Sequence, residues 1–345
     1  MHSQITAWLA IFSGLIGLTL SADRFVHYAV LIAKRAQLST FFIGMTIVAI
    51  GTSAPEIMVS IIAASTGNPK LAIGNAIGSN IANTTLVLGA TILIAPILVK
   101  THILKKEMPL LLSVTLLVGL LIFDLELNLA DAGILLAFAT GLALFVCYQH
   151  FKSKAWPEPS PSEELDDTPP ETLSLEKTFV GFGITLVLLL TFSRTLVWGG
   201  VEVAQYWNVS DTLIGLTIIA VGTSLPELAA SIASALKKHH GLALGNVIGS
   251  NVMNILLVLP WPGLIAPTLV EAEIFQRDYI FLLLITLGLA ACIYYPFYFQ
   301  QHKTERLPEN NDLTLGRIPG GLLFIAYIGY IGYLISGYLT NTPPV

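Results

Sequence analysis

The chain has few charged residues and almost no cysteine. Of its 345 residues, 11% are charged and 54% are hydrophobic, and the mean hydropathy is +0.75. So little charge is not typical of a soluble globular domain and instead favours a membrane protein. The two cysteines, Cys147 and Cys292, lie in or at the end of apolar stretches without metal-ligand spacing. We therefore interpret them as packing residues and expect no cysteine metal site.

Long apolar stretches follow one another along the chain. A helix needs roughly 20 apolar residues to cross a hydrocarbon core of about 30 Å. Transmembrane strands would instead alternate between apolar and polar residues, a pattern that the chain lacks. We predict an all-α polytopic membrane protein with ten transmembrane helices, placed at 5–33, 39–65, 71–98, 108–123, 131–149, 178–205, 211–236, 242–268, 279–298 and 318–339.

The positive charges predict the orientation. With the N-terminus outside, ten helices place 13 of the 17 Lys and Arg residues in internal loops, as the positive-inside rule requires. We therefore expect both termini outside and the central loop in the cytoplasm. Short loops are consistent with a plasma membrane of the bacterial inner-membrane type.

The two halves of the chain share a duplicated segment. Residues 44–88 and 215–259 align without a gap, and 24 of these 45 positions are identical. We predict an N-terminal repeat (1–150), an acidic, Pro-rich linker (151–177) and a C-terminal repeat (178–345). Five helices in each half would make the second repeat enter the membrane from the opposite side. Inverted repeats of this kind are a recurring design of secondary transporters, with the substrate site near the bilayer midplane.

A carboxylate and a proline interrupt one apolar stretch in each half. The sequence GTSAPE contains Glu56 and GTSLPE contains Glu227. A charge at the centre of a membrane helix costs roughly 2.5–3.5 kcal/mol on insertion scales, so such residues are usually functional. Pro55 and Pro226 have no N–H and leave backbone carbonyls unbonded, and the neighbouring Thr and Ser residues add hydroxyls. The alternative is a structural pairing of the glutamates with Arg24 or Arg194.

A second duplicated motif lies on the helix that follows. In GNAIGSNIAN, Ser79 and Asn83 are four residues apart and share a helix face, as do Ser250 and Asn254. The glycines at 74, 78, 245 and 249 predict a close approach of helix backbones. Carboxylate, hydroxyl, amide and carbonyl oxygens without His or Cys suit hard cations such as Ca²⁺, Na⁺ or Mg²⁺.

Together the two motifs, each present twice, resemble the α-repeats of the cation/Ca²⁺ exchanger superfamily, and in particular its prokaryotic Na⁺/Ca²⁺ exchanger branch. The resemblance implies a ten-helix exchanger that works by alternating access, with helices 1 and 6 sliding across the other eight. It also implies an ion site at Glu56, Glu227, Asn83, Asn254, Thr52, Ser53, Ser79, Thr223, Ser224, Ser250 and the backbone carbonyls of Ala49 and Ala220.

Asn254 departs from the pattern of that branch, whose well-described members have Asp at this position. The predicted site then carries two formal negative charges instead of three. Two carboxylates balance one Ca²⁺, two Na⁺ or two H⁺, whereas a third Na⁺ would leave excess charge in a low-dielectric site. We therefore expect the stoichiometry to differ from the three Na⁺ per Ca²⁺ that is usual in the family.

The resemblance favours a secondary antiporter that exchanges Ca²⁺ against Na⁺, not an enzyme. H⁺/Ca²⁺ exchange or a K⁺-dependent exchanger would use the same site, and a channel is a further alternative. An intramembrane enzyme is disfavoured because no HExxH or similar His-bearing constellation is present. We expect inorganic cations and the lipid bilayer as partners, no cofactor, no nucleic acid and no obligate protein partner, so that the chain acts as a monomer.

Overall fold

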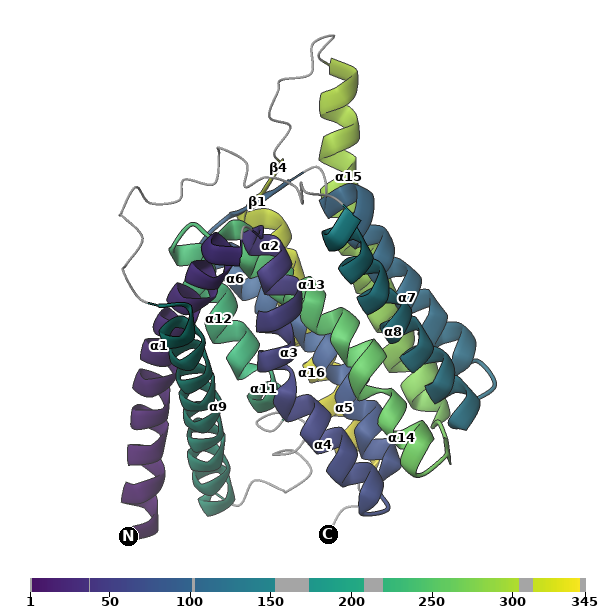
Figure 1. Cartoon of the computed structure of the whole chain (residues 1–345). Coiled ribbons are helices and arrows are strands. Elements are labelled where there is room, and N and C mark those ends of the chain that lie inside the picture. Colours follow the sequence, from purple (N-terminus) through teal and green to yellow (C-terminus); the bar gives the residue numbers. More distant parts are fainter. Residues whose placement is uncertain are drawn as a thin grey trace.

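The structure, a computed structural model, describes residues 2–36, 38–100, 103–152, 174–207, 220–303 and 313–341. It is mostly helical, with two short pairs of strands (Figure 1). Most of the predicted linker 151–177 and the first part of the predicted span 211–236 lie outside the described residues.

In the first half, each predicted span is mostly helical. The elements are α1 (His2–Ala36), α2 (Thr40–Ile43), η1 (Gly44–Val48), α3 (Ala49–Thr52), α4 (Ala54–Ser65), α5 (Pro69–Ala82), η2 (Asn83–Val87), α6 (Leu88–Ile94), β1 (Ile97–Val99), η3 (Ile103–Glu107), α7 (Met108–Leu121), β2 (Glu126–Leu127) and α8 (Leu129–Lys152). The label η marks a π-helical turn, whose hydrogen bonds reach back five residues. The predicted span 71–98 ends earlier, at Ile94, because Pro96 cannot continue a helix.

The second half repeats this order. Its elements are α9 (Leu175–Tyr206), α11 (Ala220–Thr223), α12 (Leu225–Leu236), α13 (His240–Met253), η5 (Asn254–Val258), α14 (Pro260–Ile265), β3 (Thr268–Leu269), η6 (Ile274–Tyr279), α15 (Ile280–Lys303), β4 (Leu313–Leu315) and α16 (Arg317–Asn341). The π-turns η2 and η5 begin 171 residues apart, as do η3 and η6. The duplication in sequence is therefore also a duplication in local structure.

Helices α1 and α9 lie side by side at one edge of the bundle (Figure 1). Glycines allow their backbones to touch: a methyl group at Gly14 would lie 2.8 Å from the backbone nitrogen of Leu196, and one at Gly199 would lie 2.7 Å from the carbonyl oxygen of Ala7. The pair covers the helices of the duplicated segments from one side. At the opposite edge stand α7, α8 and α15.

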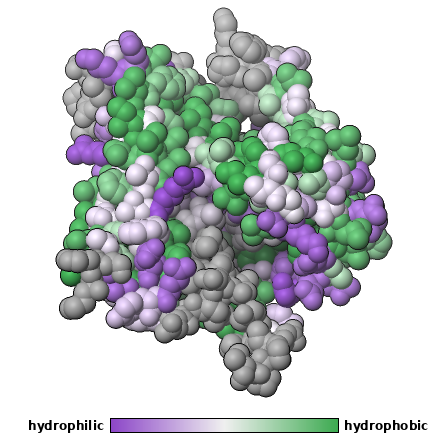
Figure 2. Space-filling model, turned by 90° about the horizontal axis from the view of Figure 1, so that it is seen from below, coloured by the Kyte–Doolittle hydropathy of each residue, from purple (hydrophilic) through white to green (hydrophobic). Residues whose placement is uncertain are grey.

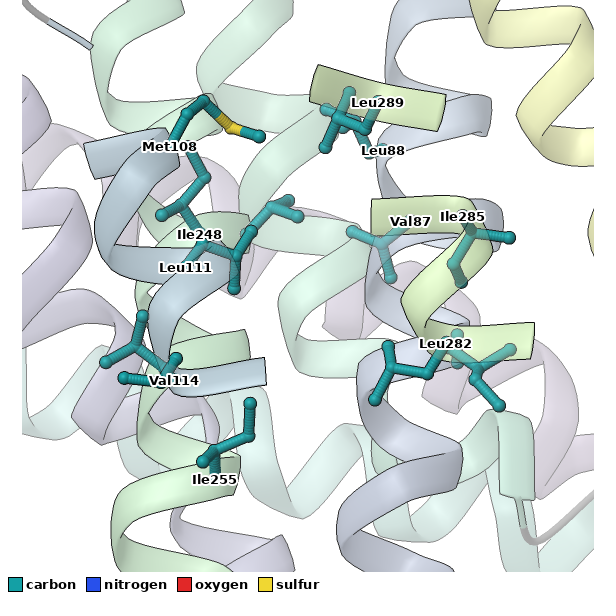
Figure 3. Close-up of a cluster of buried hydrophobic side chains, with 14 of the residues drawn as sticks. Val87, Leu88, Met108, Leu111, Val114, Ile248, Ile255, Leu282, Ile285 and Leu289 are labelled. Atoms are coloured by element: carbon teal, nitrogen blue, oxygen red, sulfur yellow. The ribbon is translucent and has the colours of Figure 1, made fainter. Parts of the chain in front are cut away.

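The larger hydrophobic core cluster lies between the duplicated helices and this opposite edge, and a smaller one lies between the duplicated helices and the pair α1 and α9. Val87 and Leu88 face Leu282, Ile285 and Leu289 of α15 (Figure 3). Nearby, the α7 side chains Met108, Leu111 and Val114 pack beside Ile248 and Ile255, and all of these are buried. The core therefore joins residues of both halves.

Two antiparallel strand pairs lie outside the helices. Ile97 of β1 pairs with Leu315 of β4, and Glu126 of β2 pairs with Leu269 of β3. Helix α7 separates β1 from β2 along the chain, and α15 separates β3 from β4. The two strand pairs therefore lie at opposite ends of α7 and α15.

Among the described residues, six helices are long and apolar enough to cross a membrane by length and composition, and the bent pair Thr40–Thr52 and Ala54–Ser65 makes a seventh. The six are Gln4–Ala36, Pro69–Ile94, Leu175–Tyr206, His240–Ile265, Ile274–Tyr295 and Arg317–Gly337. Large apolar side chains on their outer faces are exposed, and hydrophobic residues lie beside hydrophilic ones on the face of the molecule seen in Figure 2. The chain is therefore a membrane protein, as predicted.

Candidate functional site

Both halves break a helix at the same position in the duplicated segment. Ser53 separates α3 from α4 with φ −81° and ψ 5°, and Ser224 separates α11 from α12 with φ −88° and ψ 4°. The proline two residues later, Pro55 or Pro226, sits in the first turn of the new helix, where its missing N–H is tolerated. The first break bends the helix by 41°. Glu56 and Glu227 consequently lie in the first turn of a helix.

The second motif brings a change of helix type to the same region. The helices α5 and α13 switch to π-turns at Asn83 and Asn254, the last polar residues of the two copies. Single π-turns inside α-helices are rare and are frequent at functional sites. Both asparagines are completely buried, so each π-turn presents its first side chain to the interior.

Two further asparagines each form a hydrogen bond between one glutamate and the helix that follows it. The Asn75 Nδ2 donates to the backbone carbonyl of Glu56 at 3.1 Å, and the Asn246 Nδ2 donates to that of Glu227 at 3.3 Å. The prediction of site residues did not include these two side chains. The sequence does contain these asparagines at equivalent positions, because GN opens both copies of the second motif. It does not show, however, that their side chains bond to a carbonyl distant in the sequence.

Side chains of the two halves meet at the breaks. The Ser53 hydroxyl donates to Oε1 of Glu227 at 3.2 Å. The Thr52 hydroxyl shares its hydrogen between Oδ1 of Asn246, at 3.2 Å, and the carbonyl of Ala49, at 3.4 Å. The two motifs separated by 171 residues in the sequence therefore form one cluster.

Some of the other predicted side chains lie beside the same two carboxylates. Thr52 and Ser250 lie close to the Glu227 carboxylate, and Thr223 lies close to that of Glu56. Thr223 is half-buried. The others whose side chains are described are buried, namely Ala49, Thr52, Ser53, Glu56, Ser79, Asn83, Ser224, Glu227, Ser250 and Asn254. Helix α11 begins at Ala220, whose side chain lies outside the description.

The polar atoms of this cluster have far more capacity for hydrogen bonds than the protein uses. Three of the four carboxylate oxygens, both of Glu56 and Oε2 of Glu227, are buried without a hydrogen-bond partner. The same holds for the hydroxyls of Ser224 and Ser250 and for both amide atoms of Asn83 and Asn254. Buried polar atoms in proteins are nearly always bonded, so a group of orphans indicates a ligand.

The cluster also has an unbalanced charge. Glu56 and Glu227 are fully buried and interact electrostatically with each other. Among the described residues, no Lys, Arg or His forms an ion pair with either carboxylate, so the pairing with Arg24 or Arg194 is not found. An isolated buried carboxylate is costly and needs a positive partner or a proton. The donor set, which is all oxygen apart from the asparagine amide nitrogens, fits a hard cation.

The backbone carbonyls near the two prolines are not all open to the cluster. The carbonyl of Ala49 accepts from the backbone N–H of Ser53 at 2.9 Å. The carbonyl of Gly222 accepts from the hydroxyl of Ser193, a residue of α9, at 3.2 Å. The sequence predicted that Pro226 leaves a backbone carbonyl unbonded, whereas a side chain of the neighbouring helix α9 donates to it.

Comparison with known proteins gives three consistent results. Residues 6–151 and 177–336 match the family described as Sodium/calcium exchanger protein. The chain is 42% identical to the putative antiporter CaxA of Alkalimonas amylolytica, over 96% of this chain and 100% of that protein. It is 36% identical to the inner membrane protein YrbG of Escherichia coli, over 79% of this chain and 84% of that protein.

A solved structure also resembles the whole fold. The sodium-calcium exchanger NCX_Mj, soaked with 10 mM Na⁺ and 10 mM Sr²⁺, superposes with a TM-score of 0.77 at 30% sequence identity. The likeness covers 95% of this chain and 98% of that one.

Proposed function

Since this chain belongs to the sodium/calcium exchanger family, we propose that it is a secondary active antiporter that exchanges Ca²⁺ against Na⁺ by alternating access at a site of two glutamates. One observation carries the proposal: Glu56 and Glu227, from two halves of the chain, are fully buried together with three unpaired oxygens. Two buried negative charges without a basic partner require a cation. The family is one of ion exchangers, which are transporters and not enzymes.

The proposed ion ligands are the predicted ones. Glu56 and Glu227 supply the charge. The neutral oxygens come from the side chains of Thr52, Ser53, Ser79, Asn83, Thr223, Ser224, Ser250 and Asn254 and from the carbonyls of Ala49 and Ala220. Ca²⁺ takes six to eight oxygen ligands in flexible geometry, and Na⁺ also prefers oxygen. No resident cofactor enters the mechanism, since the cations are the substrates.

We further propose ten spans arranged as two inverted repeats of five. The strand pairing supports the inversion. Strand β1 and strand β3 begin 171 residues apart, yet β1 pairs with β4 and β3 pairs with β2. Because the two pairs lie at opposite ends of α7 and α15, the equivalent strands of the two repeats lie at opposite ends of the bundle. Repeats in parallel orientation would have placed them at the same end.

The proposed orientation has both termini outside and the linker 151–177 in the cytoplasm, between repeats 1–150 and 178–345. Helix α1 begins and α16 ends at the same end of the bundle (Figure 1), which supports termini on one side. The similarity to a protein named as an inner membrane protein supports a plasma membrane of that type. We propose that a single chain suffices, since the site draws on both of its repeats.

The charge of the site leads to a proposal on stoichiometry. Among the described residues, no group of three or more His, Cys, Asp and Glu side chains forms a metal-binding cluster, so the carboxylates number two. One Ca²⁺ or two Na⁺ neutralise them, and an exchange in this ratio moves no net charge. Na⁺-driven Ca²⁺ uptake in proteoliposomes should then leave the membrane potential unchanged. A current corresponding to three Na⁺ per Ca²⁺ would contradict this ratio.

Exchange of Ca²⁺ against H⁺, or a dependence on K⁺, is the alternative within the same site. Two buried carboxylates can be neutralised by two protons as well as by two Na⁺. The deciding experiment is ⁴⁵Ca²⁺ uptake into proteoliposomes with Na⁺, K⁺ and H⁺ gradients imposed in turn. We expect uptake with the Na⁺ gradient alone and none for Glu56→Gln. Uptake that is independent of the Na⁺ gradient and depends on the H⁺ gradient would overturn Na⁺ coupling. Uptake without saturation or trans-stimulation would indicate a channel.

A further inference from the structure

The carbonyl of Gly222 lies at the break that precedes Glu227 and has lost its usual partner. In an uninterrupted helix it would accept from the residue four positions later, which is Pro226 and has no N–H. The Ser193 hydroxyl of α9 donates to this carbonyl at 3.2 Å instead. Ser193 is only 4% exposed, so water does not readily replace this bond.

One face of α9 touches the helix breaks of both halves. Leu186, Ser193 and Val197 are spaced by seven and four residues and therefore lie on the same helix face. A methyl group at Gly222 would lie 2.3 Å from Val197, and one at Gly51 would lie 3.1 Å from Leu186. Each of these glycines directly precedes a threonine of the proposed ion site. The position of α9 is therefore linked by contact to both halves of that site.

Among the described residues, this hydrogen bond has no counterpart in the first half. The residue equivalent to Ser193, 171 positions earlier in α1, is Ala22, which has no hydroxyl. The nearest hydroxyl in α1, that of Ser21, donates to the carbonyl of Gly17 in its own helix at 2.6 Å. Packing alone does not require a hydroxyl at this place, because the equivalent position of the first half holds Ala22.

We propose that Ser193 is a positioning residue of the cation site. By holding the carbonyl of Gly222, its hydroxyl fixes the peptide group between Gly222 and Thr223. It thereby fixes the Thr223 side chain beside the carboxylate of Glu56. Because this inference rests on the proposed function, its test must separate weaker cation binding from a loss of transport as such.

The test compares Ser193→Ala with Ser21→Ala in proteoliposomes that take up ⁴⁵Ca²⁺ against a Na⁺ gradient. Loss of one buried hydrogen bond should raise the half-saturating Ca²⁺ concentration by about three- to tenfold, with little change in the maximal rate. Ser21→Ala removes a hydroxyl bonded within its own helix and should match the wild type. Ser193→Thr keeps the donor and should restore the wild-type value.

A second variant distinguishes the loss of the hydrogen bond from a folding defect. Ser193→Cys keeps the size of the side chain but supplies only a weak donor, so it should shift the half-saturating concentration in the same direction as Ser193→Ala. Equal values for the wild type and both variants would overturn the role of Ser193 while leaving the proposed function intact. Wild-type vesicles without Na⁺-driven uptake would instead overturn the proposed function, and the cation role of Ser193 with it.

Discussion

The Ser53 hydroxyl donates to the Glu227 carboxylate at 3.2 Å across 174 residues of sequence. The equivalent hydroxyl of the second half, that of Ser224, is buried without a hydrogen-bond partner, and so are both carboxylate oxygens of Glu56. Two almost identical motifs thus form different bonds. The second glutamate is held by the first half, whereas the first glutamate has both oxygens available for a cation.

This asymmetry predicts unequal effects of two equivalent substitutions. Ser53→Ala removes a hydrogen bond to a charged group, so it should weaken Ca²⁺ binding by about 10- to 100-fold. Ser224→Ala removes a hydroxyl without a protein partner and should have a smaller effect. ⁴⁵Ca²⁺ binding to purified protein measures both affinities, with Ser113→Ala, an exposed hydroxyl bonded within α7, as the unaffected control. Equal losses for the two serines would contradict the asymmetry.

Asn246 should contribute more to stability than its counterpart Asn75. It is fully buried, donates to the Glu227 carbonyl and to Ser231, and accepts from Thr52. Hydrogen bonds inside membrane proteins average about 0.6 kcal/mol, so three lost bonds predict a free energy of unfolding that is lower by about 2 kcal/mol for Asn246→Ala. Asn75→Ala, with one bond lost, should cost about a third of that. Unfolding in detergent gives both values, and the reverse order would refute the assignment.

Gly249 lies so close to a neighbouring backbone that no side chain fits at this position. A methyl group there would lie 2.4 Å from the carbonyl oxygen of Met45. Gly249→Ala should therefore lower the free energy of unfolding by about 1–3 kcal/mol, the usual cost of overpacking. Gly141 in α8 has no described atom within 4 Å of an added methyl, so Gly141→Ala should be neutral or stabilising by up to about 1 kcal/mol. Thermal unfolding of the two variants in one detergent compares them directly.

Glu107 should make stability depend on pH. It precedes the predicted span 108–123, and burial raises the pKa of its carboxyl to about 7 against the opposing charge of Lys106. The folded chain therefore holds this proton more tightly than the unfolded chain. The resulting stabilisation is full below pH 4.5 and is lost as the pH rises through about 7. The unfolding midpoint should fall over this range by more in the wild type than in Glu107→Gln, and parallel curves would disprove the effect.

The sequence predicted the interrupted helices and the buried glutamates but not the hydrogen bonds around them. The breaks at Ser53 and Ser224 follow from prolines two residues later, and both glutamates are buried as expected. Propensity carries no signal for a π-turn, so the switches at Asn83 and Asn254 could not be foreseen. Sequence symmetry also predicts equal bonds in both halves, whereas tertiary packing makes those of Ser53 and Ser224 differ.

The glycines of the second motif also show that equal sequence in the two halves does not predict equal contacts. Gly245 and Gly249 pack against the backbone of the first half, as predicted. Their counterparts Gly74 and Gly78 have no described atom within 4 Å of an added methyl. The segment equivalent to the one that covers Gly245 and Gly249, residues 212–216, lies outside the described residues. The close approach at Gly74 and Gly78 therefore stays a prediction.

We propose that Glu56 and Glu227 form one cation site and not two. Equilibrium dialysis with ⁴⁵Ca²⁺ on the wild type, Glu56→Gln, Glu227→Gln and the double variant tests it. We predict about one Ca²⁺ per wild-type chain, since two carboxylates balance one divalent cation. Each single variant should bind more than about 100-fold more weakly, because half of the charge is lost. If either single variant kept one Ca²⁺ per chain at wild-type affinity, the shared site would be contradicted.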